Sequence, residues 1–281
     1  MKISKIMTQI FNKRFLFILT LLSFVSCEKV IELDLKDAQT FVVIEGEVNA
    51  GDSVHTVLLS KSKSFSTDNI FETISGATIE LSDDTGNLEV LSEVSQGRYQ
   101  TINFKASEGR TYDLKVTYNG KTYTSSSTIP NKVELDSVSF IPDGFSSIGG
   151  LIAIPKRFDP ADERNFYRFD VSLKRIKDED NLGWVRDSAI LIQNDDFANG
   201  VETNQPIFGN LGSYYVGDSC RFSMMCIDEN IYKYFYSLTL NGPGGAATPA
   251  NPVSNIEGEN VLGYFSAQTK QTLEFVVKKG F

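Results

Sequence analysis

The chain has 281 residues, and its 27 basic and 36 acidic side chains give a formal net charge of −9 at pH 7. Nucleic acid is not an expected partner, because phosphate binding needs a basic patch and no cluster of five or more Lys and Arg follows residue 26. His55 is the only histidine, so a Ser-His-Asp or Cys-His group would have to use it and a zinc site would have no second imidazole. We therefore expect a protein without enzymatic activity and without a cofactor.

Residues 1–26 have the layout of a signal peptide. Four basic residues and no acidic ones open the chain: Lys2, Lys5, Lys13 and Arg14. The apolar run that follows, from Phe15 to Val25, has eleven residues, whereas a membrane-spanning helix needs about 20. Removing residues 1–26 leaves 23 basic and 36 acidic residues, a net charge of −13. This acidity keeps a protein soluble beside an anionic membrane surface.

Cys27 directly follows this leader. The residues before it, Leu22, Val25 and Ser26, resemble a bacterial lipobox, in which the cysteine thiol receives diacylglycerol before cleavage. Three acyl chains would hold the protein at a membrane, since each buried CH₂ contributes about 0.8 kcal/mol. We therefore predict lipidation of Cys27 and a lipid-anchored tether over residues 27–38. The alternative is an ordinary secreted protein with a free cysteine near its start.

Residues 39–130 are predicted to form an immunoglobulin-like or transthyretin-like β-sandwich. The stretch FVVIEGEV, which begins at Phe41, alternates apolar and acidic residues, so Glu45 and Glu47 share the face opposite Ile44. About seven short strands follow one another with turn signals at regular spacing and without a helical period. This pattern is typical of an antiparallel sandwich.

A β-hairpin is the clearest local prediction inside this domain. Asn119-Gly120 supplies the two positive φ angles of a type I′ turn between two strand-like runs. Gly109 and Tyr112, with the apolar alternation after them, resemble a tyrosine corner. In such a corner a tyrosine hydroxyl ties the preceding loop to its strand.

Residues 131–281 are predicted to form a second, mainly antiparallel β domain with one short helix. Its clearest strands are VELDSVSF, NFYRFDVSLKRI and CRFSMMCI. The helix should begin after Asp228 as its N-cap and end at Gly242, because Ile231, Phe235 and Leu238 recur at helical spacing. The boundary between the domains is placed at the Pro-containing segment near residue 130.

Cys220 and Cys226 are the two cysteines of the second domain. If both lie on one extended strand, six residues at about 3.3 Å each place them near 20 Å apart, beyond the reach of a disulfide. We favour two buried thiols, since free cysteine behaves as a small apolar residue. A bridge would require the chain to turn between them, although the cell envelope would permit one.

Two acidic clusters are candidate sites. Asp195 and Asp196, in the stretch NDDFANG, could bind a ligand, but Asn, Asp and Gly also favour a solvated turn. A calcium site built from oxygen ligands is an alternative there, or at Asp83 and Asp84. The alternating ligand loop of a calcium hand is absent from both stretches.

Loop residues supply the other candidates for a contact surface. Trp184, the only tryptophan, lies between polar residues, where an aromatic can anchor a sugar or a partner protein. We favour the alternative that its indole caps a core. A long stretch rich in Gly, Pro, Ala and Asn runs from Gly242 to Glu259 and contains Asn251 and Asn255. Loops of this length are often functional.

The order of the motifs resembles a lipoprotein family of the Bacteroidota catalogued as domain of unknown function 4249. The resemblance runs over nearly all of the chain after the leader. It rests on Cys27 with the following VIELDL, and on FVVIEGEV, SGATIEL, GRY, GRTYDLKV, DPADERNFYRF and NPVSNIEGENVLGYFSA. It implies an outer-membrane or periplasmic lipoprotein that captures or presents a ligand to a TonB-dependent transporter. It implies no catalytic residue and no particular ligand.

Our leading hypothesis is therefore a non-enzymatic, lipid-anchored outer-membrane protein that assists a TonB-dependent transporter. The side of the membrane that it faces, its ligand and its oligomeric state stay open. Two rival hypotheses are a surface structural or adhesive protein and a glycan hydrolase that uses carboxylates. Two carboxylates facing each other across a cleft would favour the hydrolase, and the absence of a concave pocket would favour the structural protein.

Overall fold

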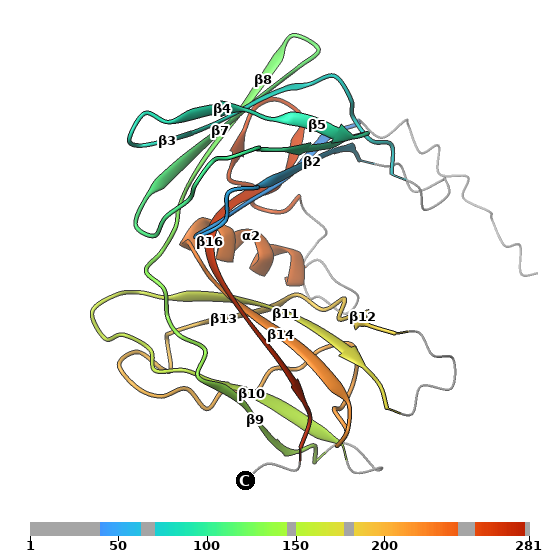
Figure 1. Ribbon diagram of the computed structural model, residues 1–281, viewed down its shortest axis with the longest axis vertical. Helices are drawn as coiled ribbons and strands as arrows, with labels where there is room; N and C mark the ends of the chain where they lie inside the picture. The colour runs from blue at the N-terminus through green and yellow to red at the C-terminus, as the bar shows by residue number, and fades with distance from the viewer. Residues whose placement is uncertain (1–39, 63–70, 145–149, 177–182, 241–250, 279–281) are drawn as a thin grey trace, which may run out of the picture. The chain divides into compact units, whose positions relative to one another are not determined.

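The computed structural model describes residues 40–62, 71–144, 150–176, 183–240 and 251–278. Over these residues the chain forms sixteen strands and one helix, which confirms the predicted all-β class with one short helix (Figure 1). The leader and the tether, with Cys27, lie outside the described residues. Among those that are described, no helix combines the length and the apolar character needed to cross a lipid bilayer.

Eight strands precede residue 130, in the stretch where the sequence predicts about seven. Their bounds are β1 (Val42–Asn49), β2 (Thr56–Lys61), β3 (Thr78–Asp83), β4 (Leu88–Val90), β5 (Ser92–Ser95), β6 (Arg98–Gln100), β7 (Thr111–Tyr118) and β8 (Lys121–Thr128). Strands β3, β4, β7 and β8 belong to a five-stranded sheet in the order β15-β8-β7-β3-β4. Strands β1, β2, β5 and β6 belong to a larger, nine-stranded sheet.

The rest of the chain supplies the remaining elements. Their bounds are β9 (Ser137–Pro142), β10 (Leu151–Lys156), β11 (Phe166–Lys174), β12 (Val185–Arg186), β13 (Leu191–Asn194), β14 (Ser219–Ile227), α2 (Glu229–Leu240), β15 (Ile256–Glu257) and β16 (Val261–Val276). The larger sheet has the order β12-β11-β14-β16-β1-β2-β6-β5, with β13 also paired to β11, while β9 and β10 form a separate hairpin.

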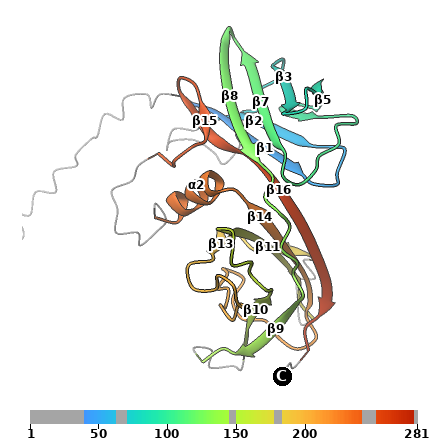
Figure 2. The same ribbon diagram turned by 90° about the vertical axis from the view of Figure 1, so that its left-hand side faces the viewer.

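Strand β16 connects the two ends of the larger sheet. Its first half runs parallel to β1, from Val261 opposite Val42 onward, and its second half runs antiparallel to β14. Along this one strand, Phe265 belongs to a first hydrophobic core, and Leu273 packs against a second one. The long red strand in Figure 2 shows this path. The last strand of the chain therefore contributes to both cores.

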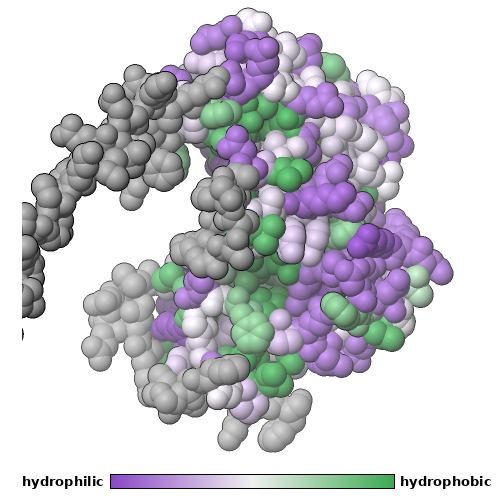
Figure 3. Space-filling model, turned by 180° about the vertical axis from the view of Figure 1, so that it is seen from behind, coloured by the Kyte–Doolittle hydropathy of each residue, from purple (hydrophilic) through white to green (hydrophobic). Residues whose placement is uncertain are grey.

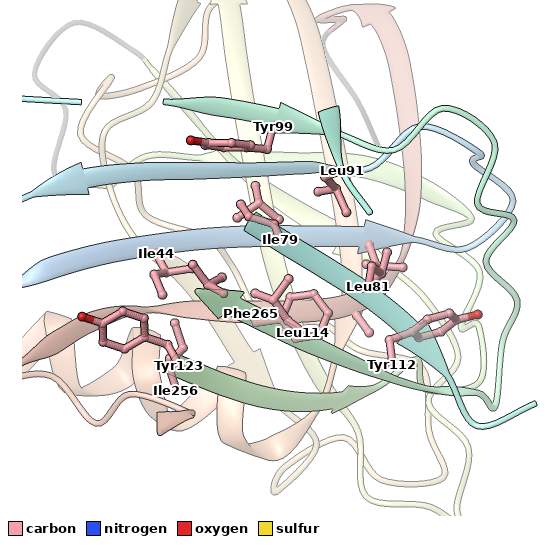
Figure 4. Close-up of a cluster of buried hydrophobic side chains, with 14 of the residues drawn as sticks. Ile44, Ile79, Leu81, Leu91, Tyr99, Tyr112, Leu114, Tyr123, Ile256 and Phe265 are labelled. Atoms are coloured by element: carbon pink, nitrogen blue, oxygen red, sulfur yellow. The ribbon is translucent and has the colours of Figure 1, made fainter. Parts of the chain in front are cut away.

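The first core lies between the five-stranded sheet and the β1 end of the larger sheet (Figure 4). Ile44, Leu114 and Phe265 come from three different strands and are each at most 2% exposed. The Tyr112 hydroxyl accepts a hydrogen bond from the Ser107 N–H at 2.8 Å, which confirms the predicted tyrosine corner. The hairpin is confirmed as well, with a positive φ at both turn residues between β7 and β8.

Helix α2 begins where the sequence predicts. The Asp228 carboxylate accepts a hydrogen bond from the Ile231 N–H at 3.0 Å, as an N-cap does. The other oxygen of this carboxylate accepts a hydrogen bond from the hydroxyl of Ser127, on β8. The Ser127 oxygen in turn accepts the backbone N–H of Ala267 at 2.9 Å. The cap therefore ties α2 to both sheets around the first core.

Both cysteines of the second part lie on β14. Cys220 and Cys226 are buried and unbonded, so the prediction of two separate thiols is confirmed. Burial raises the pKa of the Cys220 thiol to about 12. Burial also raises the pKa of Cys226, against hydrogen bonds that favour its thiolate. Both thiols therefore stay protonated at neutral pH and pack as small apolar side chains.

Candidate functional site

Two adjoining cavities open on the face of the larger sheet that carries α2. Their volumes are about 290 Å³ and 530 Å³. Four residues line both cavities: Glu45, Asp170, Arg186 and Tyr264. We call the two cavities together the α2 cleft. Figure 1 shows the helix beside β16, close to the place where that strand meets β1.

Strand register builds one wall of the α2 cleft. Tyr264 on β16 pairs with Glu45 on β1, Glu45 pairs with Leu58 on β2, and Leu58 pairs with Arg98 on β6. Paired residues point to the same face of a sheet, and successive residues point to opposite faces. Because Ile44 points into the first core, Glu45 and its row point away from it, into the cleft.

An ion pair between distant strands lies at the centre of the cleft. Arg168, on β11, donates to Glu47 Oε1 at 2.7 Å, and the Tyr264 hydroxyl donates to the same oxygen at 3.0 Å. The guanidinium also lies 4.9 Å from the ring centre of Phe235 on α2. Burial opposes ionisation of Glu47, but the charge and hydrogen bonds of its two partners outweigh burial and lower its pKa. Glu47 is therefore a carboxylate already committed to Arg168.

Three further charges of the cleft are not neutralised in this way. Among the described residues, Glu45, Arg98 and Lys270 make no ion pair, and the guanidinium of Arg98 reaches only the Thr56 hydroxyl, at 3.5 Å. Burial and the neighbouring Glu47 both raise the pKa of Glu45. Asp187 also lines the cleft without an ion pair to any described residue, but its carboxylate accepts the backbone N–H groups of Ala189, Asn210 and Leu211. The α2 cleft thus offers the charges of Glu45, Arg98 and Lys270 to a ligand.

Aromatic rings close the α2 end of the cleft. Tyr234 and Phe235, on the helix, and Tyr264, on β16, lie with ring centres 5.0 to 5.1 Å apart. They line the smaller cavity together with Leu238. Desolvation raises the pKa of Tyr234 to about 12, so its hydroxyl remains neutral at physiological pH. The helix therefore gives the smaller cavity one apolar side, while Arg168, Asp170 and Arg186 line the same cavity with charged groups.

The predicted NDDFANG residues form a hydrogen-bonded turn elsewhere in the molecule. Asp195 is 2% exposed, and its carboxylate accepts the Asn165 N–H at 2.8 Å. Its carbonyl accepts the N–H groups of Ala198 and Asn199 at 2.9 Å. Asp196 pairs with Arg164 at 3.1 Å. Both carboxylates therefore have a role in holding this turn.

The other predicted surface residues also lie outside the α2 cleft. Trp184 is 41% exposed, and the Arg221 guanidinium lies 4.7 Å from its ring centre, which corrects the expectation that the indole caps a core. Asn251 is exposed. Asn255 holds the backbone of Phe265, accepting its N–H at 3.0 Å and donating to its carbonyl at 2.8 Å.

His55 and Asp83 have local partners. His55 is 1% exposed, with Nε2 donating to the Phe104 carbonyl at 2.7 Å, and burial lowers its pKa. Desolvation opposes ionisation of Asp83, but hydrogen bonds from the side chains and backbone N–H groups of Thr85 and Asn87 together outweigh it and lower its pKa to about 2. Within the described ranges, no three His, Cys, Asp or Glu residues come together in a way that could hold a metal ion.

The residues of the α2 cleft were not singled out from the sequence. The only local signal was the acidic alternation of Glu45 and Glu47, which predicts that both lie on one strand face. Arg168, the partner of Glu47, is 121 residues away from it along the chain, so this pairing depends on the fold. Arg98 and Lys270 lie on strands whose order in the sheet could not be read locally.

Comparisons with known proteins identify a family but no activity. The sequence model of a family described as a domain of unknown function (DUF4249) matches residues 28–274. No curated protein matches the chain. Among solved structures, the adhesin InvE of Yersinia pseudotuberculosis is similar at 18% identity over 66% of this chain, with a TM-score of 0.19. The chain spans 55% of that adhesin's length, and a TM-score this low supports no argument about function.

Proposed function

The chain belongs to the DUF4249 family, and from this premise we propose that it is a non-enzymatic envelope lipoprotein that captures a ligand in the α2 cleft. We further propose that it delivers this ligand to a TonB-dependent transporter of the outer membrane. The leader and the lipobox-like residues before Cys27 support anchoring by lipid.

The observation that carries this proposal is the α2 cleft itself. Ligand sites in proteins are concave, partly apolar and equipped with a few convergent polar groups. The cleft has this composition: aromatic rings at one end, and Glu45, Arg98 and Lys270 without ion-pair partners in the described part of the chain at the other. Glu45, Arg98 and Lys270 are exposed, so their charges are accessible to a ligand that enters the cleft. The presence of a cleft also favours ligand capture over a purely structural role.

The carboxylates support binding rather than hydrolysis. A glycan hydrolase needs one carboxylic acid and one available carboxylate about 5 to 10 Å apart. In the cleft, Glu47 is held by Arg168 and Tyr264, and Asp170 pairs with Arg186 at 2.7 Å. Backbone N–H groups hold Asp187, which leaves Glu45, among the described residues of the cleft, as one available carboxylate without a second. Outside the cleft, Asp195 and Asp196 serve their own turn.

Affinity isolation from native membranes tests the transporter role. The full chain, tagged at its C-terminus and expressed in its own host, should be recovered from detergent-solubilised membranes together with a TonB-dependent transporter. A Cys27→Ala variant should leave the membrane fraction and lose the transporter. Recovery of the membrane-anchored protein without a transporter would contradict the proposal.

A further inference from the structure

We propose that the α2 cleft recognises a short peptide with free ends, about three residues long, whose amino group binds Glu45 and whose carboxylate binds Arg98 and Lys270. This inference deepens the proposed function, because it names the class of ligand that the cleft captures. It rests on the signs and positions of the charges of Glu45, Arg98 and Lys270, and on the smaller cavity beside Glu45, which α2 lines with aromatic and aliphatic side chains.

The charges in the cleft are arranged as a complement to a zwitterion. Glu45 is on β1, and the two cations are on β6 and β16. An uncharged ligand such as a neutral oligosaccharide would cover these groups without neutralising any of them, at a cost in desolvation. A molecule with one positive and one negative end satisfies both sets through charge-assisted hydrogen bonds.

The spacing of the charges sets the length of the ligand. Glu45 and Arg98 stand in one row of the sheet with Leu58 between them, so two strand spacings separate their Cα atoms. At about 4.8 Å for each spacing, this distance is about 10 Å. An extended peptide spans about 3.3 to 3.6 Å per residue, so three residues cover the same distance.

The smaller cavity fits a side chain of the first peptide residue. Glu45 lines both cavities, so an amino group bound there places its own side chain beside Tyr234, Phe235 and Leu238. This cavity has a volume of about 290 Å³ and apolar walls on its α2 side. A peptide with Leu, Met, Phe or Tyr at its first position would bury that side chain against the helix.

The pKa of Glu45 agrees with a contact between its carboxylate and the amino group of the ligand. Burial and the negative charge of Glu47 raise the pKa of Glu45, and no cation pairs with its carboxylate among the described residues. An ammonium group in contact would supply this charge and favour ionisation. Glu47 competes less for the ammonium, because the positive charge of Arg168 already neutralises its carboxylate.

Equilibrium dialysis of the detergent-solubilised full chain tests the inference. The probe is a pool of tripeptides with Leu, Met, Phe or Tyr first and two alanines after it, with mass spectrometry to measure retention. We expect retention of the free peptides. N-terminal acetylation, C-terminal amidation, Glu45→Gln and the double change Arg98→Gln with Lys270→Gln should each weaken binding about tenfold or more.

The decisive result is which protein variant and which capped peptide remove the same contact. Glu45→Gln should weaken binding of the free peptide but cause no further loss of binding for the acetylated peptide, which already lacks the amino group. The double cation variant should weaken binding of the free peptide but cause no further loss for the amidated peptide, which already lacks the carboxylate. Matched controls are Glu257→Gln and Lys115→Gln, which remove one charge each outside the cleft and should leave binding unchanged. A variant that merely misfolds would lose all peptides alike, so circular dichroism spectra accompany each measurement.

Retention of no tripeptide, equal retention of free and capped peptides, or displacement by an uncharged trisaccharide would overturn peptide recognition. Affinity isolation of the transporter is measured separately on the same membranes. If the transporter is recovered while no peptide is retained, only the ligand class is wrong. If peptides are retained without a transporter, the delivery role is wrong and the ligand class stands.

Discussion

The two cores of this protein differ in how they treat polar groups. The first core is apolar, and its buried hydroxyls and imidazole, such as Tyr112 and His55, are all hydrogen-bonded. The second part buries Arg157 and Asp159 completely, and Arg157 lies 3.9 Å from the ring centre of Tyr167. All buried side-chain atoms that lack a hydrogen-bond partner among the described residues belong to this part: Arg157 Nε and Nη2, Asp159 Oδ2, Asn165 Oδ1 and Arg168 Nε.

The two parts of the molecule therefore differ in role: the first core stabilises the fold, and the second part contributes residues to the candidate binding site. The first core is a scaffold in which each polar group is satisfied by its neighbours. The second part accepts buried charge and carries Arg168 and Asp170 into the α2 cleft. The face drawn in Figure 3 does not show this contrast, because apolar residues appear on it as separate patches among hydrophilic ones. The contrast between the parts therefore lies in the interior, where mutations can test it.

Phe265→Ala should give the largest loss of stability. The side chain is fully buried in the first core, and truncating such a phenylalanine costs about 4 kcal/mol. Because β16 continues into the second core, we expect both parts to unfold together. Fluorescence of Trp184, in the second part, should show the same lowered urea midpoint as circular dichroism of the whole chain. Two separate midpoints would show that the cores are independent.

Arg168→Met should cost somewhat less, about 3 kcal/mol. The change leaves Glu47 partly buried and without its counter-charge, and breaking a buried pair is more costly than removing it. Adding Glu47→Gln to Arg168→Met should therefore recover part of the loss in urea unfolding. If the double variant is less stable than Arg168→Met, the pair is not the reason for the loss.

Asp228→Ala should cost about 1 kcal/mol, the usual value of an N-cap side chain. The same carboxylate also binds the Ser127 hydroxyl, so the change loosens the junction of α2 with the first core. Asp228→Asn keeps the cap oxygen and should lie between Asp228→Ala and the unchanged protein in thermal unfolding. A loss for Asp228→Asn as large as that for Asp228→Ala would mean that the charge, rather than the cap, is what matters.

The smallest expected effect is a pH dependence from Glu47. Its pKa is lowered in the folded protein, so its contribution to stability is present above the unfolded value of about 4.5 and is lost as the pH falls through the folded value. The free energy of unfolding of Glu47→Gln should therefore decrease less with falling pH over this range than that of the unchanged protein. Glu45 has a raised pKa and should contribute in the opposite direction, so its contribution is lost as the pH rises. If the free energy of unfolding depends on pH in the same way in Glu47→Gln and in the unchanged protein, the expected contribution of Glu47 is contradicted.

Features with local signals were predictable from the sequence, and those that depend on distant strands were not. The Asn119-Gly120 turn, the Tyr112 corner and the Asp228 cap each need only a few neighbouring residues, and the structure confirms all three. The expectation for Trp184 failed because the general tendency of large aromatics to be buried does not say what a particular loop packs against. A cation such as Arg221 can cover an exposed indole equally well.

The α2 cleft could not be read from the sequence for the same reason. It requires the parallel pairing of β1 with β16, which joins residues more than 200 positions apart, and the placement of Arg168 beside Glu47. Parallel neighbours need a long connection, and here nearly the whole chain is that connection. Alternation shows which face of a strand is polar but not which strand lies beside it.

The position of β16 has a consequence for how the protein matures. Residues 261–276 are made more than 200 residues after β1, yet they supply its neighbour and carry Phe265 into the first core. A nascent chain that emerges with its N-terminus first therefore cannot complete either core until β16 has appeared. A premature stop before residue 261 would leave β1, on which the α2 cleft depends, without its partner even though most of the chain had been made.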